Sequence, residues 1–303
     1  MNLKLPNFLI VGAAKSGTSS LHNYLNQHND IFLPSYTENG LKVKEPRFFI
    51  KDLVKKRIHS GVWDWNEYKN LFKSSSDFKA VGESTVLYLY YYEHAINNIK
   101  KYLGSDVKII IMLRNPVDRA YSAYVHVSRG LKESFSFEEA LMLEKDRLER
   151  DQQLTPMVMY QDMGLYYKMV NYYKNEFENI HIIFHDDFKD NTEFELKKTF
   201  DFLEVYPNQK IDFSVKHNVG GLQWKNDFVK KIFMRDNLIR RTSKSLFNSN
   251  SRKNIRKNLE NFSKKKVDDM NLETRAKLKQ FYKDDVMKLG NLLKKDLSKW
   301  IEN

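Results

Sequence analysis

The feature that most constrains the fold is a loop of small residues between an apolar run and a helical pattern. Residues 8–11 form a compact apolar run that favours a buried strand, and residues 19–27 carry apolar side chains at helical spacing. Between them, Gly12 and Gly17 permit unusual dihedral angles and close approach of a ligand. Backbone amides in such a turn, with the positive end of the following helix, form a cradle for a phosphate group. An ordinary strand-to-helix turn is the alternative, and the strand–loop–helix context favours the phosphate loop.

This loop differs from the Walker loop of nucleotide hydrolases. The Walker pattern places lysine directly after its second glycine, whereas here Thr18 follows Gly17 and the lysine is Lys15, two residues earlier. The ammonium group of Lys15 is therefore displaced within the loop, where it would meet a bridging oxygen of the 5′ group of a nucleotide. Thr18 and Ser19 can add hydroxyl donors.

A second departure lies after the most apolar run, residues 107–113. Nucleotide hydrolases often end the corresponding strand with an aspartate that helps to hold magnesium, but this run is followed by Arg114. An arginine cannot coordinate a cation, and it can grip a phosphate through two hydrogen bonds. Ser122, in a helix that Pro116 opens, can donate to the same group. We therefore expect a second phosphate site in place of a metal site, although Arg114 could instead pair with Asp118.

Strand-like and helical segments alternate along the chain. Strands are expected at residues 8–11, 80–82, 107–113 and 180–184, separated by helical patterns. This alternation predicts a three-layer α/β fold of the P-loop type, with a central parallel sheet flanked by helices. An amphipathic pattern over residues 272–300 predicts a helix packed on the core. With no repeat or linker, we expect a single domain over residues 1–303 whose basic, helical C-terminal portion begins at about residue 216.

Composition and charge exclude several classes of protein. The chain has no cysteine, which excludes disulfides, thiolate zinc sites and cysteine nucleophiles. No apolar run is long enough to span a membrane, so we expect a cytoplasmic location. Residues 216–303 hold 23 Lys and Arg against 10 Asp and Glu, most densely over 240–266. Such a basic surface has two interpretations of equal weight: it attracts a polyanion, or it is a solvated face without a binding role. Because only Phe247 and Phe262 lie in the dense stretch, we expect no specific nucleic acid.

Four segments, in the right order, resemble those of the sulfotransferases that use 3′-phosphoadenosine 5′-phosphosulfate (PAPS). The likeness is greatest to the carbohydrate (heparan sulfate type) branch and its bacterial relatives. The segments are Ala-Ala-Lys-Ser-Gly-Thr-Ser-Ser-Leu at 13–21, Lys-Glu-Pro-Arg-Phe-Phe at 44–49, Gly-Glu-Ser-Thr at 82–85, and Leu-Arg-Asn-Pro-Val-Asp-Arg-Ala-Tyr-Ser at 113–122. Parts of residues 273–300 are also similar to that family.

The resemblance implies a transferase that moves a sulfuryl group from PAPS to a hydroxyl or amine and releases adenosine 3′,5′-bisphosphate (PAP), without a metal. The acceptor would be a carbohydrate or another alcohol, including an anionic one. Glu45 lies where heparan-type enzymes place their catalytic base, and Lys15 would assist at the transferred group. The residues that the resemblance assigns to the donor are Lys15, Ser16, Gly17, Thr18, Ser19, Ser20, Arg114, Ser122, Lys216, Asn218, Gly220 and Gly221.

Alternatives remain for several of these residues. Glu45 could merely pair with Lys42 or Arg47 on a surface loop, and Glu83 is expected to be structural. Ser84 stands where heparan-type enzymes usually have a lysine, which leaves the acceptor open. The rival functions are an atypical P-loop kinase and a basic nucleic-acid-binding protein. Side chains expected to be surface or core residues, rather than ligands, are His126, His181, His185, His217, Tyr88, Tyr90, Tyr91 and Tyr92.

Overall fold

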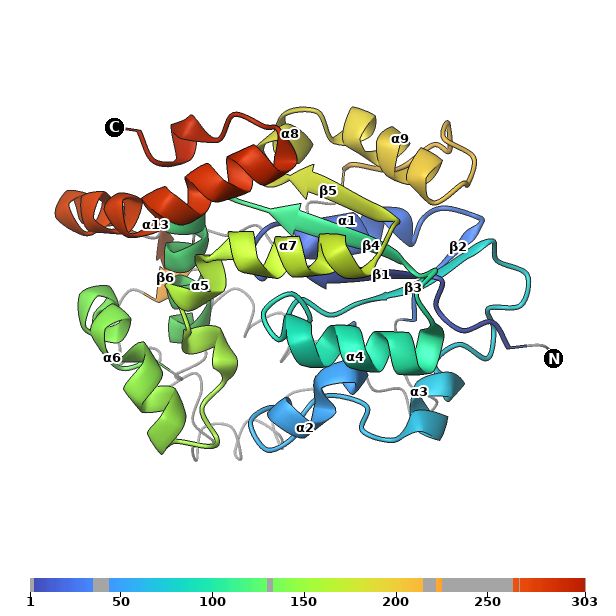
Figure 1. Ribbon diagram of the computed structural model, residues 1–303, viewed down its shortest axis with the longest axis horizontal. Helices are drawn as coiled ribbons and strands as arrows, with labels where there is room; N and C mark the ends of the chain where they lie inside the picture. The colour runs from blue at the N-terminus through green and yellow to red at the C-terminus, as the bar shows by residue number, and fades with distance from the viewer. Residues whose placement is uncertain are drawn as a thin grey trace, which may run out of the picture.

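A five-stranded parallel sheet forms the centre of the protein (Figure 1). The strands lie in the order β2-β3-β1-β4-β5, and every neighbouring pair is parallel. Their bounds are Phe8–Gly12 (β1), Ile31–Phe32 (β2), Ala80–Ser84 (β3), Lys108–Leu113 (β4) and Ile180–Phe184 (β5). Four of the five were predicted, because strands buried on both faces read as continuous apolar runs. The second predicted strand, 80–82, was too short, since pairing with β1 continues through Ser84.

The structure is a computed structural model that describes residues 3–34, 44–129, 133–214, 222–224, 264–266 and 268–302. The ranges 222–224 and 264–266 are described as backbone only, and they form the antiparallel pair β6 (Leu222–Trp224) and β7 (Lys264–Lys266). Most of the basic stretch 240–266 therefore lies outside the described residues. The same holds for four predicted donor ligands, Lys216, Asn218, Gly220 and Gly221.

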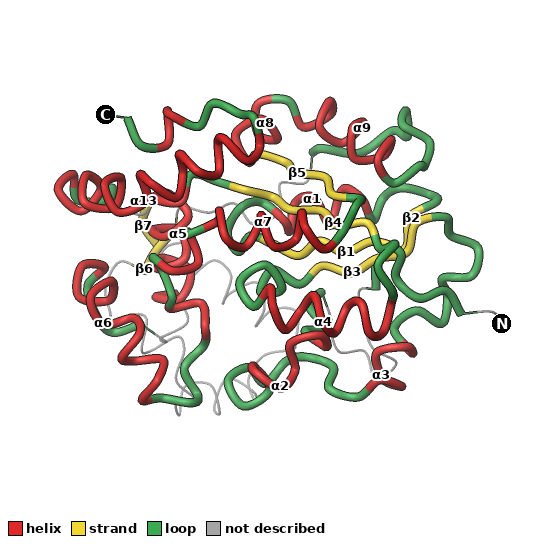
Figure 2. Tube along the Cα trace, viewed as in Figure 1, coloured by secondary structure: helices red, strands yellow, loops and turns green. Residues whose placement is uncertain are grey.

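Helices cover both faces of the sheet, which confirms the three-layer architecture (Figures 1 and 2). Alternate strand residues such as Leu9 and Ile109 face one core, with α4 (Tyr92–Leu103), α5 (Pro116–Arg129), α7 (Tyr166–Glu176) and α13 (Leu272–Leu293). The intervening residues, such as Ile10 and Ile110, face a second core with α1 (Thr18–Leu25), α8 (His185–Asp190) and α9 (Thr192–Phe202). This alternation follows from the two-residue period of a strand.

The remaining elements are short, apart from one helix with a complete cap. Helix α6 (Phe137–Arg150) begins with a capping box, in which Ser136 and Glu139 satisfy each other's backbone amides. The C-terminal pattern predicted over 272–300 is not one helix, because α13 ends where Lys294 turns to a left-handed φ of 51°. The others are η1 (Phe48–Ile50), α2 (Lys51–Val54), α3 (Trp65–Asn70), η2 (Pro156–Val158), η3 (Asp162–Gly164) and η4 (Ser298–Trp300).

The order of the strands determines where a ligand can bind. After β1 the chain moves to the β2–β3 side of the sheet, and after β4 it moves to β5 on the other side. The loops that leave the carboxyl ends of β1 and β4 therefore diverge, and in open α/β sheets ligands bind in the crevice at such a switch point. The predicted phosphate loop follows β1, and Arg114 follows β4, so both lie at this point.

Candidate active site

The loop between β1 and α1 adopts a conformation that its glycines make possible. Gly17 has a φ of 100° and caps α1 without a side-chain hydrogen bond, which leaves the first amides of the helix to other partners. At Gly12 a Cβ atom would come within 2.6 Å of the Leu89 Cβ, so no larger residue fits. Lys15 has a φ of 70°, an uncommon conformation for a residue with a side chain. Such strain is typical of functional loops, and the open helix end suits an anion.

The hydroxyl residues of the loop differ in how far they are open to a ligand. Ser16 is fully buried beside the Tyr166 hydroxyl, so its side chain belongs to the interior. Thr18 is also buried, at 3% exposure, in the first turn of α1. Ser19 and Ser20 are half-buried, and the Ser19 Oγ accepts a hydrogen bond of 2.9 Å from the Lys44 Nζ. Ser19 therefore links the loop to the Lys-Glu-Pro-Arg-Phe-Phe segment.

Positive side chains from separate segments surround Lys15. The pKa of Lys15 is lowered to about 8, first by burial and then by the nearby charges of Arg129, Arg114 and Lys44, against a smaller opposite effect of Glu45. Arg129 lies at the end of α5, Arg114 follows β4, and Lys44 precedes Glu45 in the chain. The site is therefore electropositive, which would favour a ligand with several negative charges.

Arg114 lies against the phosphate loop. Its Nη1 donates a hydrogen bond of 3.2 Å to the Lys15 carbonyl, across the β1–β4 switch point. The alternative partner, Asp118, instead pairs with Arg275 of α13 at 2.8 Å. Ser122 lies half-buried on α5, in the helix that follows Arg114. The structure thus brings Arg114 to the phosphate loop, and its role as a phosphate ligand stays a prediction.

Glu45 forms the ion pair with Arg47 that a purely structural role predicts, and it also lies close to the phosphate loop. Its Oε2 is 2.8 Å from the Arg47 Nη2, and its Oε1 is 3.6 Å from the Lys44 Nζ. The Arg47 Nη1 also donates to the Glu45 carbonyl at 2.9 Å. The Glu45 charge acts on the pKa of Lys15 and of His126, and Lys44 contacts both Glu45 and Ser19 of the phosphate loop. The pairing therefore holds a carboxylate next to the phosphate loop.

Glu83 is the centre of a buried cluster of hydroxyl groups. It lies on β3, is 1% exposed, and accepts hydrogen bonds from Tyr88 at 2.8 Å, Thr85 at 2.8 Å and Tyr68 at 3.3 Å. Burial raises the pKa of Glu83 to about 7, although these three hydrogen bonds oppose the shift. The sequence predicts a structural role for Glu83, and its complete burial agrees with that.

Comparison with known proteins identifies the family. A family model described as the sulfotransferase domain matches residues 5–290, nearly the whole chain. The chain belongs to the sulfotransferase family. It is therefore a transferase, and the architecture of its parallel sheet is that of the family.

Several relatives of this sulfotransferase share only part of their length with it. The human bifunctional heparan sulfate N-deacetylase/N-sulfotransferase 2 is 33% identical over 127 residues, which are 41% of this chain and 13% of that protein. A membrane-associated sulfotransferase of Dictyostelium discoideum is 27% identical over 164 residues, 48% of this chain and 30% of that protein. The chain thus spans less than a third of these relatives. The crystal structure of a sulfotransferase from Alicyclobacillus acidocaldarius matches 99% of this chain and 100% of its own, with 29% identity and a TM-score of 0.72.

One histidine has charged neighbours that the sequence analysis did not consider. His126 was expected to be a surface or core histidine, and it is exposed. It follows Ser122 by four residues and precedes Arg129 by three, so all three share one face of α5. Its ring is open to solvent, yet its surroundings lower its pKa to about 4, first through desolvation and then through the charges of Lys15 and Arg129. The helical spacing from Ser122 was the signal that could have found it.

The other histidines and the tyrosines that were expected to be surface or core residues are buried or half-buried where the structure describes them. His181 stacks on Phe202 and contacts the Thr199 hydroxyl, and His185 contacts Asp186. The hydroxyl of Tyr90 donates to Asp162 at 2.8 Å. Among the described residues, no group of three or more His, Asp or Glu is arranged to hold a metal ion. His217 lies outside them.

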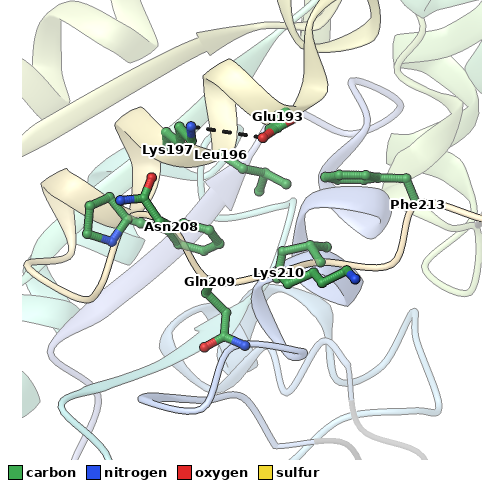
Figure 3. A pocket seen from close by; sticks show the side chains of 10 residues that line it. Glu193, Leu196, Lys197, Asn208, Gln209, Lys210 and Phe213 are labelled. Atoms are coloured by element: carbon green, nitrogen blue, oxygen red, sulfur yellow. Dashed lines mark ion pairs between the residues drawn. The ribbon is translucent and has the colours of Figure 1, made fainter.

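A pocket on the surface of the sulfotransferase lies apart from this site. It has a volume of about 300 Å³ between α9 and the segment 207–213, and residues such as Lys197, Lys210 and Phe213 line it (Figure 3). None of the predicted site residues lines this pocket. In the described part of the chain, no helix is both long and apolar enough to cross a lipid bilayer.

Proposed function

We propose that this sulfotransferase takes its sulfuryl group from PAPS, bound on residues 12–20 and on Arg114. One observation carries the proposal: Arg114 contacts the Lys15 carbonyl across the switch point between β1 and β4, and the charges of Arg129, Arg114 and Lys44 all act on Lys15. A donor with a phosphosulfate at one end and a 3′-phosphate at the other would neutralise this excess of positive charge.

Each end of the donor has its own group of residues in this proposal. Lys15 and the amides at the start of α1 would bind the phosphosulfate, with Ser19 and Ser20 beside them. Arg114 and Ser122 would bind the 3′-phosphate, since an arginine follows β4 where hydrolases place a magnesium ligand. The contributions of Lys216, Asn218, Gly220 and Gly221 stay predictions from the sequence, because these residues lie outside the described ranges.

The reaction is an in-line displacement at sulfur. An acceptor oxygen or nitrogen forms a bond to sulfur while the bond from sulfur to the bridging oxygen of the donor breaks, and PAP leaves. Glu45 accepts the proton that the acceptor loses, a contribution of roughly 10²–10⁴-fold to the rate. Lys15 stabilises the negative charge that develops on the bridging oxygen. The protein's main task is to hold the donor and acceptor in line.

The proposed acceptor is a carbohydrate, attacked through a hydroxyl or an amine. The names of two relatives support this class: heparan sulfate N-deacetylase/N-sulfotransferase 2 and human carbohydrate sulfotransferase 15, which is 23% identical over 168 residues, or 45% of this chain and 29% of that protein. Transfer of ³⁵S from labelled PAPS tests it, with N-deacetylated heparosan as an amine acceptor and chondroitin as a hydroxyl acceptor. Label in neither polysaccharide would count against these carbohydrate classes.

Calorimetric titration tests the donor. PAP should bind in the micromolar range without a metal ion, and Arg114→Ala should weaken binding by roughly tenfold or more, as expected for the loss of a charged hydrogen bond. Lys277→Ala is the matched control, because it removes a positive charge from an exposed ion pair with Glu273 on α13. Tight binding of ATP with magnesium and no binding of PAP would refute the donor assignment and favour a kinase.

A further inference from the structure

The segment that carries Glu45 is fastened to the protein by two backbone amides. The Arg47 amide donates a hydrogen bond of 3.3 Å to the Thr85 Oγ1, and the Phe49 amide donates one of 3.3 Å to the Tyr88 hydroxyl. Both acceptors belong to the loop that follows β3, nearly forty residues further along the chain. These two hydrogen bonds join the Lys-Glu-Pro-Arg-Phe-Phe segment to the loop beside the central strand.

The same two hydroxyls donate to one carboxylate. Thr85 donates to the Oε2 of Glu83 at 2.8 Å, and Tyr88 donates to the Oε1 at 2.8 Å. A hydroxyl has one hydrogen, and its oxygen can accept while that hydrogen is donated elsewhere. Because an ionised carboxylate only accepts, both hydroxyls must give it their hydrogens and turn their lone pairs to the two amides. Glu83 thus orients both hydroxyl groups so that their lone pairs face the two amides.

The fastened backbone determines where the Glu45 side chain lies. Arg47 has a left-handed φ of 59°, a conformation that needs support in a residue with a side chain. From this position its guanidinium group reaches back to the Glu45 carboxylate at 2.8 Å and to the Glu45 carbonyl at 2.9 Å. It also donates to the Ser60 carbonyl at 2.8 Å. Loss of the hydrogen bond from the Arg47 amide to Thr85 would free the backbone that places the Arg47 guanidinium group against Glu45.

We propose that Glu83 is a positioning residue for Glu45 and acts through the hydroxyls of Thr85 and Tyr88. The inference rests on the proposed role of Glu45 as the proton acceptor. Glu83 itself is closed off from solvent and touches no reacting group, so it works only by orienting the two hydrogen bonds that hold the segment.

The ionisation of Glu83 adds a dependence on pH. Its pKa is raised to about 7 by burial, and the groups that face it are Tyr68 of α3, Thr85, Tyr88, Tyr173 of α7 and, at longer range, Glu45. A protonated carboxyl presents a donor on one oxygen, so it no longer requires hydrogens from both hydroxyls. The hydrogen bonds that the Arg47 and Phe49 amides donate should therefore weaken as the pH falls through about 7.

Residue-resolved hydrogen–deuterium exchange of the Arg47 and Phe49 amides, normalised to intrinsic rates, tests the proposal. Thr85→Val should speed exchange at Arg47 by roughly five- to tenfold and leave Phe49 protected, and Tyr88→Phe should do the reverse. Glu83→Gln, which has only one accepting oxygen, should speed exchange at one or both amides and abolish the pH dependence between pH 6 and 8.5. Tyr68→Phe is the control, because Tyr68 donates to Glu83 but to neither amide. It should move the midpoint of the pH dependence upward, since its hydrogen bond lowers the pKa of Glu83, and leave both amides protected at pH 8.5.

Two outcomes would overturn the inference. The first is wild-type exchange at both amides in Glu83→Gln throughout this pH range, and the second is equal loss of protection at both amides in every variant, including Tyr68→Phe. If Glu83→Gln does not fold, the separate effects of Thr85→Val and Tyr88→Phe decide the matter. Calorimetry with PAP keeps the two proposals apart: an unmodified protein that fails to bind PAP contradicts the donor assignment, whereas the exchange rates test Glu83 alone.

Discussion

Proton uptake on binding PAP would reveal the role of Lys15. In the free protein the pKa of Lys15 is about 8, because burial and three neighbouring positive charges disfavour its charged form. At pH 8 the lysine is therefore about half protonated. A bound phosphate would favour the charged form, and a rise of two pKa units, about 2.7 kcal/mol, would complete the protonation. We expect an uptake of about 0.5 proton per PAP at pH 8 and almost none at pH 7.

Titration in buffers that differ in ionisation enthalpy, such as Tris and Hepes, measures this uptake. The observed enthalpy of binding changes with the buffer in proportion to the protons taken up. At pH 8 the phosphates of PAP are fully ionised, since their second pKa is about 6, so they add nothing. Lys15→Met keeps the length of the side chain and should show no uptake. Uptake near zero in the unmodified protein, or the same uptake in Lys15→Met, would refute the assignment of Lys15.

Three further predictions follow from other parts of the structure. Glu45→Gln should lower kcat by roughly 10²–10⁴-fold and leave the Kd for PAP unchanged, in a steady-state assay with calorimetry; a lost PAP affinity would contradict a role confined to proton transfer. Asp285→Asn concerns a carboxyl whose pKa is raised by burial to about 6, while it accepts hydrogen bonds from the Tyr167 amide at 3.2 Å. The folded state thus binds this proton more tightly than the unfolded state. The free energy of unfolding should therefore fall by about 1–2 kcal/mol, after allowance for partial exposure, as the pH rises from 4 through 6. Thermal denaturation should show less of that fall in Asp285→Asn, and an unchanged profile would refute the shift. Ser136→Ala breaks the capping box of α6 and should cost about 0.5–2 kcal/mol, measured by urea denaturation against Ser134→Ala, which keeps the cap.

The sheet could largely be predicted because its central strands β1, β3 and β4 are buried on both faces, and an apolar run such as 107–113 stands out from the surrounding polar sequence. β5 lies at the edge of the sheet and is mostly half-buried, yet residues 180–184 still read as a short apolar run. β2 has only two residues, too few to show any period, and it exists because it pairs with β3. The end of α13 was also beyond reach, because Leu297 and Trp300 continue the apolar pattern although the helix has already ended.

The two halves of the site differ in how much the sequence reveals. Lys15 and Arg114 follow strands that both read clearly, so their meeting across the switch point could be anticipated from topology. The hydroxyl cluster around Glu83 could not be, since Tyr68, Thr85 and Tyr88 meet only when α3 packs against the loop after β3. Hydrogen bonds between segments that are distant in sequence leave no local pattern, and the short motif at 82–85 indicated only that a glutamate was present.

The order of the strands also has a consequence for synthesis on the ribosome. β1 is made first, yet its two partners in the sheet are β3, which ends at residue 84, and β4, which ends at residue 113. Until both have emerged, β1 cannot pair along both of its edges, and the phosphate loop that follows it is not held between β3 and β4. The nascent chain must therefore carry this apolar strand without both of its partners while the residues from the end of β1 at Gly12 to the end of β4 at Leu113 are made. During that time the strand is open to wrong pairing or to capture by chaperones.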